Sequence, residues 1–179
     1  MKLSKLSLFA ALLFVFALVL APAAEARGAK APGGSTIYEI ASSSPDFTIL
    51  TLALETTGLD AALNGGGQFT VFAPNDAAFL ALEAAYPGIL NDLINDPATL
   101  SAVLLYHVTD GRRWSNSLVN RNNPKPVEML SGGFITVNPN ATITDTDSLG
   151  LNSPDSAIIA ANISASNGVI HVISEVLIP

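Results

Sequence analysis

The sequence predicts an α+β fold, in which helices come first and an antiparallel β-sandwich or barrel of short strands follows. Apolar residues recur at helical spacing over residues 36–106, whereas short β-rich runs separated by turn residues follow Gly111. Because the helices and most of the strands occupy separate halves, the order argues against repeated βαβ units. Hydrophobic residues make up 49% of the 179 residues, which is enough for a packed core.

The first residues are typical of an export leader. Lys2 and Lys5 precede an apolar run over residues 6–21, and Ala24-Glu25-Ala26 offers small residues for cleavage. The run is shorter than the about 20 residues that cross a bilayer. We therefore expect a cleaved signal peptide (residues 1–26), a flexible arm (27–35) and a single domain (36–179), with no membrane span after cleavage.

The first predicted helix begins at Ser44-Pro45, a cap followed by proline at the first helical position. Phe47, Leu50 and Leu54 then recur at helical spacing. Gly58 suits the left-handed position that ends a helix, and one further turn is expected over residues 59–63.

Two more helices carry their own start signals. Asn75-Asp76 is predicted to cap a helix that runs through Phe79 and Leu82. Asp96-Pro97 repeats the pattern of a cap followed by proline. Beyond it, one helical face carries four residues at positions i, i+3, i+4 and i+7, namely Leu100, Val103, Leu104 and His107.

Six runs of residues are predicted to be strands. One lies among the helices, at Phe69-Thr70-Val71-Phe72, and stops at Pro74. The other five lie in the second half, over residues 127–130, 134–138, 142–146, 157–163 and 169–177.

The amino-acid composition excludes several classes of function. Cysteine is absent, which excludes disulfides, thiol catalysis and cysteine-bound metals. The formal net charge is −7, and removal of Lys2, Lys5 and Glu25 with the leader leaves 6 basic and 14 acidic residues, or −8. An acidic surface is a poor match for nucleic-acid phosphates, so we expect no nucleic-acid partner.

Catalytic motifs are absent from the sequence. The two histidines, His107 and His171, lie in apolar surroundings and are best interpreted as hydrogen-bonded core residues. No His-Glu-x-x-His or Gly-x-Ser-x-Gly motif is present, and no metal or cofactor is expected. One alternative stays open at this point, namely a catalytic site whose serine, histidine and carboxylate are brought together only by folding.

The basic residues gather around the single tryptophan. Arg112, Arg113 and Arg121 flank Trp114, with Lys125 nearby. Arginine and tryptophan are enriched where proteins bind partners, so this cluster is our candidate binding surface. The alternative is a strand-end loop whose tryptophan packs back onto the core.

Three stretches together resemble the fasciclin-like domain family. They are Phe69-Thr70-Val71-Phe72-Ala73-Pro74-Asn75-Asp76-Ala77-Ala78-Phe79, Leu104-Leu105-Tyr106-His107-Val108, and Asn167-Gly168-Val169-Ile170-His171-Val172-Ile173 with Val176-Leu177-Ile178-Pro179. The resemblance implies a compact wedge, a β-sandwich with a cluster of helices at its N-terminal side, and structural roles for both histidines. It also implies extracellular adhesion, and it carries Tyr106 and His107 over as binding candidates from the integrin-binding neighbourhood of animal members.

The function expected from these observations is that of a secreted, non-enzymatic adhesion or matrix-binding module. Its partner would be a surface or matrix protein or a polysaccharide, and the protein would be a monomer or a weak homo-oligomer. It would be extracellular, with retention in a periplasm or at the cell surface left open. Two alternatives are a secreted hydrolase that uses His171 or His107, and a carrier of small apolar ligands, which needs a sizeable pocket.

Overall fold

The computed structural model describes residues 34–119, 123–145 and 155–179. The expected signal peptide lies outside these residues, as does the expected arm except for Gly34 and Ser35. The described helices are α1 (Ile37–Ser43), α2 (Thr48–Thr57), α3 (Leu59–Asn64), α4 (Asp76–Ala85), α5 (Ile89–Asn95), α6 (Pro97–Tyr106) and α7 (Ser115–Leu118). The described strands are β1 (Phe69–Pro74), β2 (Val108–Asp110), β3 (Lys125–Glu128), β4 (Phe134–Val137), β5 (Thr142–Thr144), β6 (Ser156–Ala165) and β7 (Gly168–Ile173).

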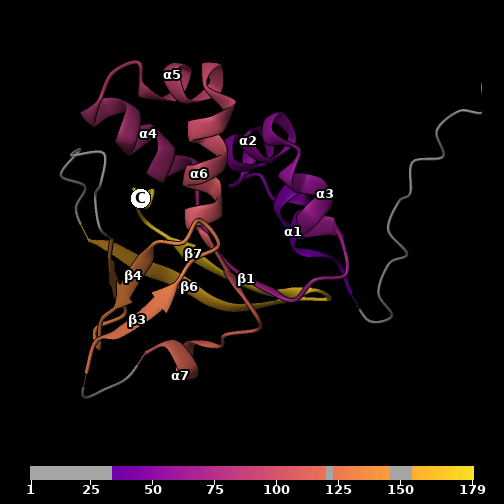
Figure 1. Ribbon diagram of the computed structural model, residues 1–179, viewed down its shortest axis with the longest axis vertical. Coiled ribbons are helices and arrows are strands. Elements are labelled where there is room, and N and C mark those ends of the chain that lie inside the picture. Colours follow the sequence, from indigo (N-terminus) through magenta and orange to yellow (C-terminus); the bar gives the residue numbers. More distant parts are fainter. Residues whose placement is uncertain (1–33, 120–122, 146–154) are drawn as a thin grey trace, which may run out of the picture.

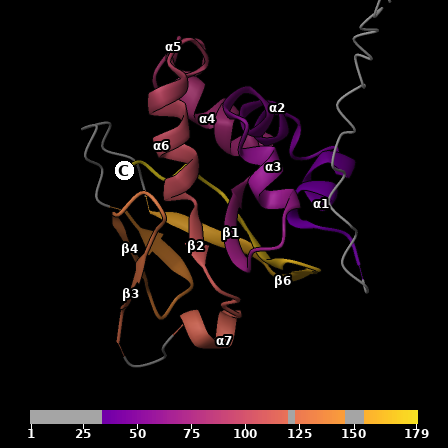
Figure 2. The ribbon, with the colours of Figure 1, turned by 45° about the vertical axis from the view of Figure 1, so that its right-hand side comes forward.

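The predicted α+β class is confirmed. Helices α1 to α6 lie together on one side of the strands, and the short α7 lies at the opposite end of the molecule (Figure 1; Figure 2). The strands form one sheet in the order β2-β1-β7-β6-β5-β4-β3. All neighbouring pairs are antiparallel except β1 and β7, which are parallel over six residue pairs from Phe69↔Gly168 to Pro74↔Ile173.

That parallel pair corrects the expectation of an antiparallel sheet throughout. Parallel strands need a long crossover between them, whereas antiparallel strands can be joined by a tight hairpin. Here the chain passes through α4, α5, α6 and the outer strands before β7 lies beside β1. The sequence patterns of β1 and β7 are apolar on both faces, which is typical of central strands, but they carry no signal of direction.

The sheet is nearly closed on itself. The Leu130 amide donates to the carbonyl of Val108 at 2.8 Å, and the Thr109 hydroxyl donates to the carbonyl of Glu128 at 2.7 Å. These bonds join β2, at one end of the sheet, to β3 and the segment that follows it, at the other end. Edge strands expose unpaired main-chain groups, and this closure provides partners for some of them.

Two clusters of buried residues form the core. The larger lies between the helices and the strands β1 and β7, and includes Leu50, Leu104 and Ile170. The smaller lies within the folded sheet and includes Phe72 and Ile135. Each cluster buries the apolar face of one layer against another, as a two-layer domain requires.

The predicted start of the helix at Ser44-Pro45 is wrong. Helix α2 begins at Thr48, while Ser44 is the C-cap of α1. The N-cap position of α2 is Phe47, which has no oxygen with which to cap. Instead Asp76, from the start of α4, accepts hydrogen bonds from the amides of Thr48 at 3.3 Å and Ile49 at 2.9 Å. One helix therefore supplies the cap of another, which local sequence does not reveal.

The other helix signals are confirmed. The Asn75 side chain accepts from the Ala78 amide at the start of α4, and Asp96 accepts from the amides of Ala98 and Thr99 before Pro97-led α6. Gly58 has the left-handed conformation, with φ of 72°, between α2 and α3.

Strand β7 ends earlier than the expected residue 177. Just beyond Ile173 the Ser174 amide still donates to the Ala157 carbonyl of β6. Further along, the amides of Leu177 and Ile178 donate to the side chains of His107 and Asp145 instead of to a neighbouring strand. Strand β3 covers Lys125–Glu128 rather than the expected 127–130, and the Met129 amide donates to the Gly133 carbonyl at the turn that leads to β4.

No single helix among the described residues has both the length and the apolar character to cross a membrane. Helices α4 and α5 meet that criterion only when counted together, and they are bent by 108° relative to each other.

Candidate functional site

The segment from Gly111 to Ser115, here called the tryptophan loop, is held in place by hydrogen bonds to its main chain. The Thr70 hydroxyl donates to the Gly111 carbonyl at 2.7 Å and accepts from the Arg113 amide at 2.8 Å. The Ser115 amide donates to the Asn162 side chain at 2.8 Å, and the Asn162 amide group returns a bond to the Ser115 hydroxyl at 2.7 Å. Since β1 and β6 supply these partners, the loop is attached to the sheet.

Arg112 contributes its guanidinium to this attachment. Its Nε donates to the Gln68 side chain at 2.5 Å, and one terminal nitrogen donates to the carbonyls of Ala165 and Ser166 at 2.8 and 2.6 Å. These bonds tie the loop to the turn between β6 and β7. Arg112 is therefore a positioning residue in this structure, although it is exposed.

Arg113 is partly exposed and Trp114 is exposed. The Nε of Arg113 donates to the Asp110 carbonyl at 3.2 Å, and its terminal nitrogens make no hydrogen bond within the part of the chain that the structure describes. The Trp114 side chain is 38% exposed, so it does not pack fully back onto the core. Arg121, the remaining member of the predicted cluster, lies outside the described residues.

His171 holds the tryptophan loop from the inside. The ring is buried in β7, stacked on Phe72 with centroids 5.7 Å apart. Its Nδ1 accepts from the Asn162 amide at 3.4 Å, so Nε2 carries the proton and donates to the Arg113 carbonyl at 2.8 Å. Burial lowers the pKa of His171, and the bond to the Arg113 carbonyl opposes that change.

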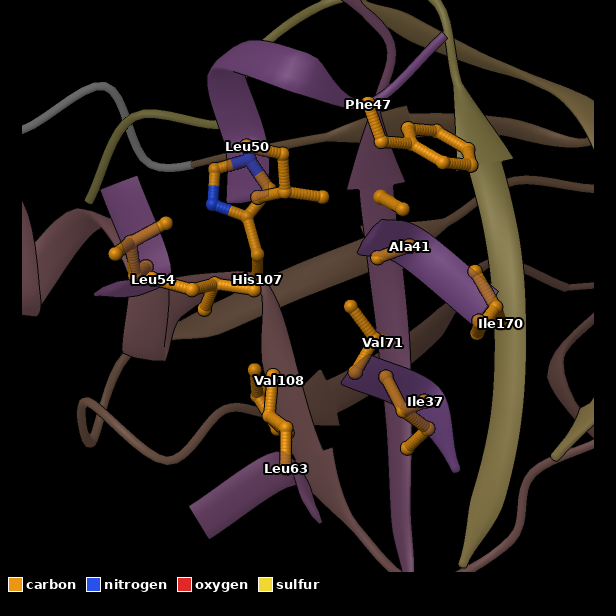
Figure 3. A pocket seen from close by; sticks show the side chains of 12 residues that line it. Ile37, Ala41, Phe47, Leu50, Leu54, Leu63, Val71, His107, Val108 and Ile170 are labelled. Atoms are coloured by element: carbon orange, nitrogen blue, oxygen red, sulfur yellow. The ribbon is translucent and has the colours of Figure 1, made fainter. Parts of the chain in front are cut away.

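His107 joins the helices to the C-terminal segment. Its ring lies beside Leu50 among apolar side chains (Figure 3). Nε2 accepts from the Leu177 amide at 2.9 Å, which leaves Nδ1–H to donate to the Val103 carbonyl at 2.7 Å. Burial lowers the pKa of His107 to about 4, against the bond to Val103, which raises it. The ring is therefore neutral at pH 7.

Both histidines are buried and hydrogen-bonded, which confirms the prediction of core roles. A histidine base needs one ring nitrogen directed at the proton it removes. In His107 and His171 the main chain occupies both nitrogens, and among the described residues neither ring bonds a serine oxygen or a carboxylate. The same described residues contain no group of three or more His, Asp or Glu placed to hold a metal ion.

Tyr106, the other residue suggested by resemblance, is also enclosed. Its side chain is 0% exposed, and its hydroxyl donates to the Phe134 carbonyl at 2.8 Å. The bond joins the end of α6 to β4. Tyr106 and His107 are neighbours in sequence, and both are too deeply buried in this structure for a partner to contact them directly.

Asn167 is an important residue that the sequence pattern did not single out. It is buried, and its side-chain oxygen accepts from the Ile37 amide at 2.8 Å while its amide group donates to the carbonyls of Leu63 and Gly65 at 2.6 and 3.2 Å. It therefore holds α1 and the end of α3 to the turn before β7. Asn167-Gly168 is a turn signal in sequence, and nothing local indicates that the side chain points inward.

Comparison with solved structures identifies the fold as that of fasciclin I. A chain from "a FAS1 Domain Pair from the Insect Cell Adhesion Molecule Fasciclin I" superposes with a TM-score of 0.68 at 18% sequence identity, covering 81% of this chain and 51% of that chain. The identity is too low to indicate more than a shared α+β architecture.

The sequence places the protein in the same family. The family described as Fasciclin domain matches residues 45–179, so the chain belongs to the fasciclin domain family. The Synechocystis protein sll1735 is 32% identical over 142 residues, covering 79% of this chain and 96% of that protein. The pig transforming growth factor-beta-induced protein ig-h3 is 30% identical over 155 residues, covering 83% of this chain but only 20% of its own length.

Proposed function

We propose that the protein is a secreted, non-enzymatic adhesion or matrix-binding module that recognises a surface protein or polysaccharide through the tryptophan loop. The observation that supports this most is the fixed main chain of the loop, which holds a half-exposed Trp114 and the guanidinium of Arg113 in one geometry. A preorganised loop loses little conformational entropy when it binds.

The chemistry of the two side chains suggests the class of partner. An indole can stack on a sugar face or an aromatic side chain, and a guanidinium can pair with a carboxylate through two parallel bonds. Because the mature chain would carry a charge of −8, Arg113 is a local exception on an acidic surface. We therefore favour a partner that carries carboxylates, such as an acidic polysaccharide or an acidic segment of a matrix protein.

A protein of the same fold supports the adhesive part of this proposal. Fasciclin I is an insect cell adhesion molecule, and it shares the fold of this chain. The hydrolase alternative loses its support because both histidine rings are used by the main chain. Tyr106 and His107 act in our proposal by supporting the scaffold.

The test is retention of the mature protein on surface extracts or on an array of acidic glycans. Trp114→Ala and Arg113→Ala should each lower retention at least about tenfold, which corresponds to about 1.4 kcal/mol. Leu80→Ala is the matched control, because Leu80 is 60% exposed on α4, at the opposite end of the molecule from α7 (Figure 2). Retention by wild type should also fall with added salt. Equal retention by Trp114→Ala, Arg113→Ala and wild type would contradict the assignment of the loop.

A further inference from the structure

The helix cluster contains an apolar pocket that is separate from the tryptophan loop. It has a volume of about 170 Å³ and lies among α2, α4, α5 and α6. The buried side chains of Ala53, Phe79, Leu93 and Leu100 line its interior. Leu52 and Ile94, which are 53% and 44% exposed, lie at its mouth. The four helices that line the pocket lie on the side of the molecule away from α7 (Figure 1).

The volume distinguishes this pocket from ordinary packing defects. Two other pockets, on the sides of α2 and α3 that face the sheet, hold about 20 and 30 Å³, close to one water molecule. An engineered apolar cavity of about 150 Å³ in another protein stays dry and binds benzene. The pocket among the four helices is thus large enough for one aromatic ring.

Three carboxylates connect the ends of the helices that line the pocket. Asp76 on α4 caps α2, and Glu83 on α4 accepts from the amides of Gly88 at 2.7 Å and Leu90 at 3.0 Å at the start of α5. Asp96 ends α5 and caps α6. These side-chain-to-main-chain bonds join the ends of α2 and α4, of α4 and α5, and of α5 and α6.

The lining also specifies the chemistry of an occupant. The pocket is lined by eight apolar residues, which offer no side-chain hydrogen bond to a polar ligand. Burying a polar group there would cost free energy without compensation. We propose that this pocket is a binding site for a small apolar molecule of the size of a single aromatic ring, a ligand site independent of the tryptophan loop.

Toluene is the probe for this proposal. Titration of the mature protein, followed by ¹³C-methyl NMR, should produce saturable shifts at the methyl groups of Leu52, Leu93 and Leu100. Toluene should also raise Tm, because a ligand that binds only the folded state stabilises it. Ala53→Leu should fill the pocket and abolish the saturable shifts. Ala84→Leu, which adds the same side chain on the exposed face of α4, should bind toluene like wild type.

Ala53→Val is the milder second variant, and it should weaken binding in the same direction if Ala53→Leu does not fold. The proposal is overturned if wild type shows no saturable shift up to the solubility of toluene, or if filled variants bind as well as wild type. It is also overturned if the same methyl groups shift with protein concentration alone, because a second copy of the chain then covers the mouth.

Discussion

The two layers of helix packing differ in how completely they are filled. Where helices α1 to α3 meet the sheet, two pockets hold about 20 and 30 Å³, and His107 and Asn167 bond main-chain groups across the junction. Among α2, α4, α5 and α6 the remaining space is about 170 Å³, and the carboxylates that fix the helices lie at helix ends rather than in the interior.

This difference indicates where the stability of the fold depends on single residues. At the junction, buried polar side chains bond main-chain groups, and removal of one deprives those groups of this partner in an apolar setting. In the helix cluster, apolar contacts are spread over many side chains, so a single substitution costs less. The predictions below test this contrast, from the largest expected effect to the smallest.

Gly168→Ala should be the most damaging small substitution. A Cβ at this position would lie 2.0 Å from the Phe69 carbonyl oxygen and 2.7 Å from Ile37, so β1 and β7 would have to separate. We expect a loss of about 4 kcal/mol or more in the free energy of unfolding, measured by urea denaturation. Gly66→Ala is the control, because a Cβ there meets nothing within 4 Å. Equal stability of the two variants would refute the close approach of β1 and β7.

Asn167→Ala should cost about 3 kcal/mol, because it leaves the Ile37 amide and the Leu63 and Gly65 carbonyls without their side-chain partner. Hydrogen exchange should increase at Ile37 and in α3 before it increases in α6. Asn91→Ala, on the exposed face of α5, should change stability by less than about 0.5 kcal/mol. A small effect of Asn167→Ala would mean that the junction does not depend on this side chain.

The burial of His107 predicts an acid-dependent loss of stability. The folded-state pKa of about 4 lies below the ordinary value of 6.5, so the unfolded state binds more protons between these two pH values. The free energy of unfolding should therefore decrease as the pH is lowered through that range. His107 alone should account for a decrease of about 2 kcal/mol between pH 7.5 and pH 5.

The matched experiment compares urea denaturation of wild type and His107→Gln at both pH values. Burial raises the pKa of Glu175, which acts in the opposite direction, but both proteins carry that residue and the difference between them isolates His107. An identical pH dependence in the two proteins would show that His107 titrates normally in the folded state.

Asn75→Ala and Asp76→Ala should each cost about 1 kcal/mol through loss of a helix cap. The two neighbours should nevertheless affect different helices. Loss of Asn75 exposes amides at the start of α4, whereas loss of Asp76 exposes Thr48 and Ile49 at the start of α2. Amide hydrogen exchange distinguishes them, and increased exchange confined to α4 in both variants would contradict the cap supplied by Asp76.

The parts of the fold that depend on local signals could be predicted from the sequence. The caps at Asn75 and Asp96, the left-handed Gly58 and the helical face of Leu100, Val103 and Leu104 each depend on residues within one turn of each other. The burial of both histidines followed from their apolar neighbours. In these cases local propensity and tertiary structure agree.

The features that sequence reasoning missed all involve partners distant along the chain. Asp76 caps a helix that begins 28 residues earlier, and Asn167 bonds an amide 130 residues away. The parallel direction of β1 and β7 depends on the path of everything between them. At the candidate binding site, the sequence grouped Arg112 with Arg113, but only folding brings Gln68 and Ala165 to the guanidinium of Arg112.

The protonation states of the two imidazoles test the central claim most directly, that both rings are neutral main-chain bridges. Long-range ¹H–¹⁵N NMR of the mature protein at pH 7 reports which ring nitrogen carries the proton. We predict the Nδ1–H form for His107 and the Nε2–H form for His171, with His107 unprotonated down to about pH 5. Mixed tautomers in rapid exchange, or titration of both rings near pH 6.5, would contradict it.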